Sequence, residues 1–180
     1  MENINITEIF ENAKKDPGLF SKIDVNELLK AVENENTDYL ENKTLKSISQ
    51  EIFDTLNKIP CEPEKIKQWC DNLIGYRLVS EIYELHKQKF VKTICIYDEK
   101  TGEPPSYYRM KANGKVANIR FINTGTQILC VSPPQRFTQY KFDHHLTFQE
   151  LSEEEQMILM AYEYITEEEE KGKEKQRRAS

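Results

Sequence analysis

Residues 107–122 read YYRMKANGKVANIRFI, with two β-rich runs on either side of Asn113-Gly114. Both residues of this pair tolerate a positive φ, which the turn of a two-residue hairpin requires. The sequence therefore predicts that strands 107–112 and 115–122 form a hairpin. Three more β-rich runs surround it, at residues 89–97, 127–131 and 136–142.

Five consecutive short strands with tight connections form an antiparallel meander, and a meander of this size curls to hide its edge strands. We therefore expect the α+β class, with N-terminal helices, a central five-stranded antiparallel small β-barrel of the SH3-like or Tudor-like kind, and a C-terminal helix. The expected segments are an acidic helical segment at 1–84, a basic antiparallel β-module at 85–150, the C-terminal helix at 151–170 and a charged tail at 171–180.

Start and stop signals locate the helices outside the β-module. Thr44 can begin a helix whose apolar residues recur every three or four positions. Pro63 suits the first turn of the next helix, which is expected to end at Gly75. Ser152 and Glu155 form a capping box for the C-terminal helix. Two earlier helices are predicted at 7–15 and 25–33.

The net charge of −6 is spread unevenly along the chain. Residues 1–84 carry 17 acids and 10 bases, residues 85–142 carry 3 acids and 10 bases, and residues 143–180 carry 11 acids and 5 bases. A basic segment between two acidic ones can attract a nucleic acid, whose phosphates bind cations. It can equally hold the basic strands against the acidic helices within one fold.

Aromatic residues accompany these cations, since nine of the chain's eighteen lie between residues 85 and 148. Rings stack on unpaired bases while cations neutralise phosphates, so a small basic barrel can bind a single strand. Alternatively, most of the rings fill the barrel. The candidate binding surface contains both kinds of side chain: Tyr107, Tyr108, Arg109, Lys111, Lys115, Arg120, Arg136 and Tyr140.

A protein partner is the other hypothesis. The loop at 102–108, GEPPSYY, offers aromatic rings on a backbone that two prolines restrain, and exposed strand edges can accept an added strand. The prolines can also simply stiffen a long connection whose tyrosines pack inward. We expect a non-catalytic binding protein, with a protein–protein interaction module preferred and single-stranded nucleic acid as the alternative partner.

No catalytic, cofactor or metal site is predicted. Cys130, Asp143 and His144 could form a nucleophilic triple, but Cys130 lies in the apolar run ILCV and is expected to be a core thiol. Adjacent residues such as His144 and His145 point to opposite faces of a strand, unlike the close ligand pairs that zinc requires. The chain contains no phosphate-binding P-loop motif either.

The chain is expected to be intracellular and not bound to a membrane. Its four cysteines include no C-x-x-C pair, which fits free thiols in a reducing compartment. Residues 1–10 lack the basic and apolar regions of a secretory signal, and no apolar run approaches the roughly 18 residues that cross a bilayer.

Two stretches carry a resemblance to a known family: IKQWCDNLIGYR at 66–77 and LTFQELSEEEQ at 146–156. They resemble uncharacterised proteins of giant nucleocytoplasmic large DNA viruses such as the marseilleviruses, whose Lys-, Asn-, Ile- and Glu-rich composition is similar. The resemblance implies a viral origin and a place in the host cell or virion. It implies no activity and no functional residue.

Overall fold

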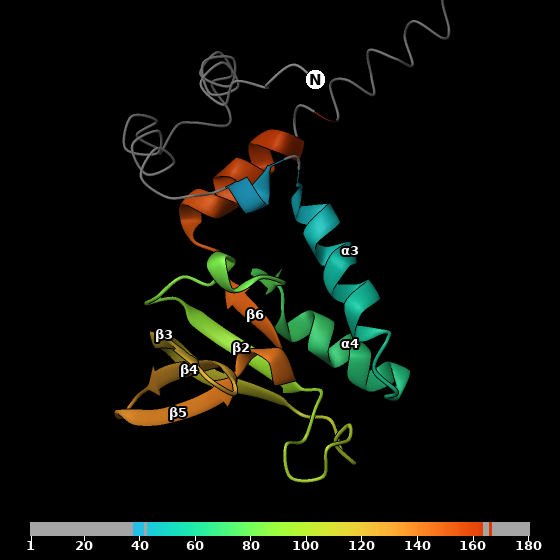
Figure 1. Ribbon diagram of the computed structural model, residues 1–180. Helices are drawn as coiled ribbons and strands as arrows, with labels where there is room; N and C mark the ends of the chain where they lie inside the picture. Colours follow the sequence, from blue (N-terminus) through green and yellow to red (C-terminus); the bar gives the residue numbers. More distant parts are fainter. Residues whose placement is uncertain (1–37, 42, 164–165, 167–180) are drawn as a thin grey trace, which may run out of the picture. The chain divides into compact units, whose positions relative to one another are not determined.

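The computed structural model describes residues 38–41, 43–163 and 166 of the chain (Figure 1). It divides into two compact units, one made of residues up to Ser47 together with those from Ser152, and one made of Ile48–Leu151. The sheet and the candidate site both belong to the second unit. The helices predicted at 7–15 and 25–33 and the tail at 171–180 lie outside the described residues.

The helices near residue 44 and residue 63 begin where the sequence predicts. In α3 (Leu45–Leu56), the backbone N–H of Ser47 donates to Thr44 Oγ1 at 3.0 Å, so Thr44 caps the helix as expected. Next comes α4 (Pro63–Asn72), and Gly75 follows it with a φ of 79°. Both predictions are confirmed because start and stop signals depend on local backbone chemistry.

The first unit contains a short 3-10 helix, η1 (Asp38–Leu40), and a helix over residues 153–163. The predicted capping box at its start is present. The backbone N–H of Ser152 donates to Glu155 Oε2 at 2.6 Å, and the N–H of Glu155 donates to Ser152 Oγ at 3.2 Å. The Tyr39 hydroxyl also donates to Glu155, which connects the two helical pieces.

The second unit is built on one antiparallel sheet with the strand order β1-β6-β2-β3-β4-β5. Its strands are β1 (Tyr76–Val79), β2 (Phe90–Cys95), β3 (Met110–Ile122), β4 (Gly125–Ser132), β5 (Arg136–Lys141) and β6 (His145–Glu150). Two 3-10 turns lie between strands, η2 (Ile82–Glu84) before β2 and η3 (Phe142–His144) between β5 and β6.

The α+β class is confirmed, but the closed five-stranded barrel is wrong. The sheet is open and has six strands, with β1 and β5 at its edges. Closure fails because β6 pairs with β2 on one side and with β1 on the other, so it has no edge left for β5. The chain passes from β5 to β6 through η3 without pairing the two strands.

The predicted hairpin at Asn113-Gly114 is also wrong. Both residues lie inside β3, a continuous strand of 13 residues that pairs with β2 and β4. Gly114 has the positive φ that the pattern predicts, 89°, but it uses it at an irregularity in the β2–β3 register. The true β3–β4 turn is at Asn123-Thr124, between the paired residues Ile122 and Gly125.

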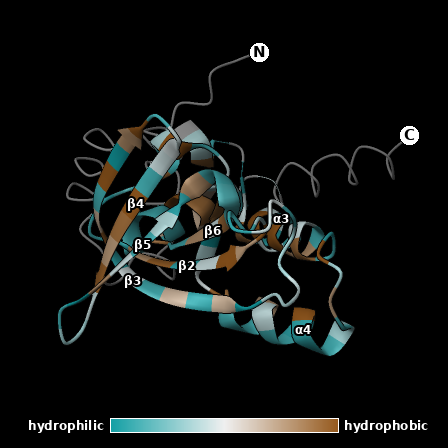
Figure 2. Cartoon of the chain, turned by 60° about the horizontal axis from the view of Figure 1, so that its bottom comes forward, coloured by the Kyte–Doolittle hydropathy of each residue, from teal (hydrophilic) through white to brown (hydrophobic). Residues whose placement is uncertain are grey.

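The register assigns each strand residue to one of two faces, because paired residues share a face and neighbours along a strand alternate. Figure 2 shows hydrophobic and hydrophilic residues in turn along much of β3, whereas the middle of β4, ILCV at 128–131, is hydrophobic throughout. One face, which we call the inner face, carries a core cluster. Its buried members are Val79, Leu85, Val91, Val116, Ile128, Cys130 and Tyr140.

The opposite side, the outer face, has a covered part and an open part. The covered part includes β2, where Lys92 Nζ donates a hydrogen bond to the carbonyl oxygen of Asn72 at the end of α4. Phe148 and Ile94 point to this side and are 0% exposed. The open part lies on β3, β4 and β5, where Lys115 and Phe137 are exposed.

Acidification below about pH 6.5 is expected to destabilise the sheet through His145. Burial lowers the pKa of this half-buried ring, the positive charges of Lys111 and His144 lower it further, and the contact of Nδ1 with the Lys141 carbonyl oxygen at 2.9 Å opposes them. The folded protein therefore binds this proton at a lower pH than the unfolded chain. Its contribution to stability is complete above the unfolded pKa and is lost as the pH falls below it.

The measurement is the free energy of unfolding in urea at about pH 7.5 and about pH 5.5. Other groups also titrate over this interval, so the comparison is between the wild type and His145→Gln. The variant should lose less stability on acidification than the wild type. Equal losses in the two proteins would show that His145 is not held neutral by the fold.

Candidate binding site

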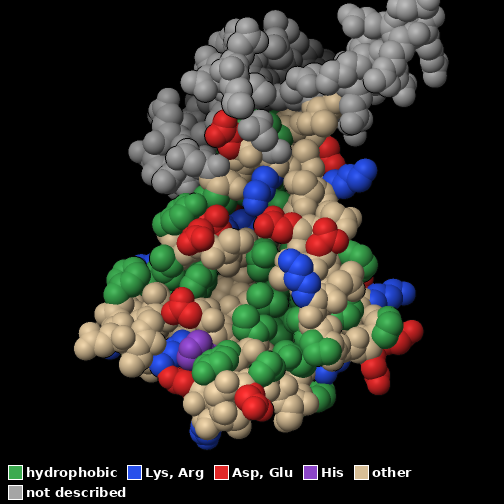
Figure 3. Space-filling view, turned by 45° about the vertical axis from the view of Figure 1, so that its right-hand side comes forward, with side chains coloured by type: hydrophobic (Ala, Val, Ile, Leu, Met, Phe, Trp, Pro, Cys, Tyr) green, Lys and Arg blue, Asp and Glu red, His purple; other side chains and the backbone are tan. Residues whose placement is uncertain are grey.

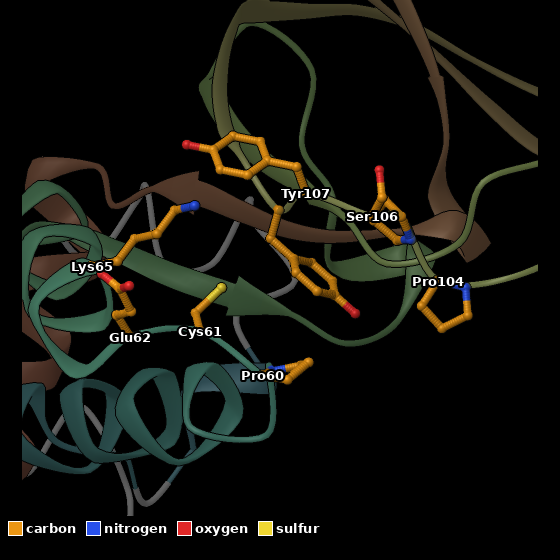
Figure 4. A pocket seen from close by; sticks show the side chains of 9 residues that line it. Pro60, Cys61, Glu62, Lys65, Pro104, Ser106 and Tyr107 are labelled. Atoms are coloured by element: carbon orange, nitrogen blue, oxygen red, sulfur yellow. The ribbon is translucent and has the colours of Figure 1, made fainter.

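A pocket of about 610 Å³ lies between two segments of the second unit (Figure 4). One segment, 60–65, leads from α3 into the first turn of α4, and the other, 104–108, precedes β3. Three prolines and two tyrosines supply most of the wall. The lining residues are Pro60, Cys61, Glu62, Lys65, Pro104, Pro105, Ser106, Tyr107 and Tyr108.

Both segments are fixed by their own backbone. The N–H of Cys61 donates to the carbonyl oxygen of Ile59 at 2.8 Å, which turns the chain after α3, and Pro63 then sets the first turn of α4. On the other side, Asp98 and Glu103 pair, and the N–H of Gly102 donates to the carbonyl oxygen of Asp98 at 2.8 Å. The loop therefore closes on itself before the two prolines begin.

Lys65 links the two walls of the pocket. Its Nζ lies 3.8 Å from the centroid of the Tyr107 ring and 5.3 Å from that of Trp69, so one ammonium group contacts an aromatic ring on each side. Figure 4 shows Lys65 directed toward Tyr107. The Tyr107 side chain is still 70% exposed, which leaves most of its ring available to a ligand.

The chemistry of this pocket is that of a binding surface. Three proline rings and two tyrosine rings supply apolar surface, and Glu62, Lys65 and the hydroxyl groups add a few polar groups, the usual composition of a site that holds a ligand by contact. Figure 3 shows hydrophobic side chains gathered on the lower middle of the view, with charged side chains of both signs around them.

The eight predicted site residues do not form one surface. Tyr107 and Tyr108 line the pocket, and the exposed Arg109 follows them. By the register, Lys115 and Arg120 point to the outer face, while Lys111 points to the inner side. Arg136 is exposed at the start of β5.

The prediction that Tyr140 belongs to the binding surface is wrong, because this residue lies in the core. It is 7% exposed, its hydroxyl lies 3.4 Å from Thr147 Oγ1, and burial raises its pKa. A ring held in this way cannot stack on a base or a peptide. Its position on the inner face depends on the register of β5, which the sequence alone does not determine.

The sequence does not identify the pocket wall at 60–65 as part of a binding site. In the sequence, Pro60 and Pro63 indicate only the break between two helices. Their contact with residues about 40 positions further along is a tertiary feature. The adjacent prolines at 104–105 are the one feature of the sequence that indicates a binding site here, because rigid segments commonly frame such sites.

The structure does not bring the possible nucleophilic triple together. Cys130 is 0% exposed in the inner-face core, and burial raises its pKa to about 12. The Asp143 carboxylate accepts a hydrogen bond from the N–H of Thr126 at 3.1 Å. The centroid of the His144 ring lies 4.7 Å from that of the Tyr97 ring. Among the described residues, no cluster of three or more His, Cys, Asp or Glu side chains could hold a metal ion.

Comparisons of the chain with protein-family models, with curated proteins and with solved structures find no match. The resemblance to giant-virus proteins therefore stays a prediction. In the part of the chain that the structure describes, no helix combines the length and the hydropathy needed to span a membrane.

Proposed function

We propose that the protein is a non-catalytic binding protein that holds an extended, proline-containing segment of another protein in the pocket between residues 60–65 and 104–108. The observation that carries this proposal is the convergence of three prolines and two tyrosines from two distant segments around about 610 Å³. Sites for small ligands typically measure roughly 300–1,000 Å³.

The shape of the expected ligand follows from the walls. Proline-rich segments adopt the polyproline II conformation before they bind, and they dock into grooves lined by aromatic rings. Tyr107 and Tyr108 supply such rings, and the prolines keep the walls rigid, so little conformational entropy is lost on binding. An intracellular location and a viral origin belong to the same proposal.

Peptides selected from a displayed library of random decapeptides against the full chain test it. We expect the selected peptides to contain proline and to bind Tyr107→Ala at least about 10-fold more weakly than the wild type, because a central aromatic contact is removed. Tyr83→Ala is the matched control. Tyr83 lies outside the pocket, and its exposed fraction of 69% is nearly that of Tyr107, 70%.

The control should bind as the wild type does. Peptides that bind Tyr107→Ala and the wild type equally well would show that this pocket is not the site. An equal loss in Tyr83→Ala would lead to the same conclusion, because the effect would then not depend on the pocket.

A further inference from the structure

The three strands β3, β4 and β5 contain cations without any carboxylate. From Met110 to Lys141 the sequence includes five Lys or Arg residues and no Asp or Glu. The pairing register arranges the open outer face into three rows across these strands. The rows are Phe90–Lys115–Val131–Phe137, Asn118–Leu129–Gln139 and Arg120–Gln127–Lys141, with Phe90 contributed by β2.

Two aromatic rings stand at the ends of the first row. Phe137 is 67% exposed and Phe90 is 38% exposed, so both present ring surface to solvent. Lys115 lies between them in the row, with Nζ 5.1 Å from the centroid of the Phe90 ring. Neighbouring strands are about 4.8 Å apart, so the three intervals of this row separate the two phenylalanines by about 14 Å.

The cations of this face differ in their pairing. Lys141 forms an ion pair with Glu99, which lies in the loop before β3. Neither Lys115 nor Arg120 forms an ion pair with any residue that the structure describes. The positive charge of these two side chains is therefore available on the same face as the exposed rings.

We propose that the open outer face binds single-stranded nucleic acid without strong sequence preference. Phe137 and Phe90 stack on unpaired bases, and Lys115 and Arg120 contact the phosphates on either side of them. Every base offers a face for stacking, whereas the bases of a duplex are already stacked and cannot reach the rings. A protein partner is a weaker match, because Lys115 and Arg120 form no ion pair with any described residue and the middle row offers only two amides and one leucine. None of these residues lines the proline and tyrosine pocket, so this proposal is independent of the first.

Fluorescence anisotropy of labelled oligothymidylate and oligouridylate, each about 12 nucleotides long, tests the proposal on the full chain, with a duplex of equal length beside them. Binding is expected at about 50 mM salt and should weaken steeply toward about 200 mM. Phe137→Ala should weaken it by about 5- to 100-fold, and Phe137→Tyr, which keeps a ring, should bind nearly as the wild type does.

Phe121→Ala is the matched control for the ring. Phe121 is 75% exposed on β3 but points to the inner side, so its loss should leave binding unchanged. Lys115→Gln and Arg120→Gln should each reduce the slope of log affinity against log salt by about 0.7, the value for one single-strand phosphate contact. Lys67→Gln, at an exposed lysine of α4, should not change the slope.

Three results would each overturn the proposal. They are no binding of either oligonucleotide at about 50 mM salt, binding that Phe137→Ala leaves intact, and a duplex bound as tightly as the single strands. Binding of either oligonucleotide with the expected pattern of variants supports it, and the difference between the two shows whether the sugar matters. Urea unfolding of each variant confirms that the fold is intact.

Discussion

Gly114→Ala is expected to destabilise the sheet by about 3 kcal/mol or more. Two costs combine at this position. Gly114 has a φ of 89°, a conformation that costs an L-residue about 1–2 kcal/mol. An added Cβ would also lie 2.3 Å from the carbonyl oxygen of Val131 and 2.8 Å from Cβ of Ser132.

The second cost is large because the obstacle is backbone. The carbonyl group of Val131 belongs to β4, which pairs with β3 on one side and with β5 on the other. It cannot withdraw from a new Cβ without breaking hydrogen bonds of the sheet. The measurement is the free energy of unfolding in urea at neutral pH.

Gly75→Ala separates the two costs. Gly75 has a similar φ of 79°, and a Cβ added there meets nothing within 4 Å. Gly75→Ala should therefore lower the free energy of unfolding by only about 1–2 kcal/mol, the cost of a positive φ for an L-residue. If both alanine variants lose the same amount, β4 relaxes around the new methyl group, and the close approach at Gly114 does not constrain the sheet.

The error at Asn113-Gly114 shows what a local pattern can and cannot predict. The pattern predicts a positive φ, and Gly114 has one. It does not say whether the chain reverses there or continues past an irregularity, because both need the same backbone conformation. The choice depends on β4 lying close enough for its carbonyl group to touch Gly114, which is a contact between segments.

The helices were predictable for the opposite reason. Thr44, Pro63, Ser152 and Glu155 act on the backbone within the next few residues, so their chemistry is visible in the sequence. By contrast, β1 has only four residues, and it pairs with β6, some 70 positions away. A strand defined by such a distant partner has almost no signal of its own. The sequence therefore predicts neither β1 nor β6, and it divides β3 into two strands, which together give five strands in place of six.

For the candidate binding surface, too, the sequence predicts local composition but not contacts between segments. Composition predicts that residues 107–120 combine rings and cations, and Tyr107, Lys115 and Arg120 are exposed. Composition does not determine the face on which each side chain lies. On β5, Phe137 is 67% exposed while Tyr140 is 7% exposed, because an odd number of steps along the strand separates them.

Phe148→Ala is expected to destabilise the protein by about 3–5 kcal/mol, the usual loss when a buried phenylalanine is truncated. Phe148 is 0% exposed in β6, where it pairs with Lys92 of β2 and Leu78 of β1. Its ring fills the covered part of the outer face, and removal leaves a cavity that a paired strand on each side prevents from collapsing. Urea unfolding at neutral pH measures the loss.

Phe137→Ala is the natural comparison, because Phe137 lies on the same outer face of the same sheet but in the open part. Truncation of a ring that is 67% exposed should change the free energy of unfolding by no more than about 0.5 kcal/mol. A loss of several kcal/mol there would mean that the ring packs against the protein. It would then not be free to stack on a base, so the stability of this variant decides whether its binding data can be interpreted as a lost contact.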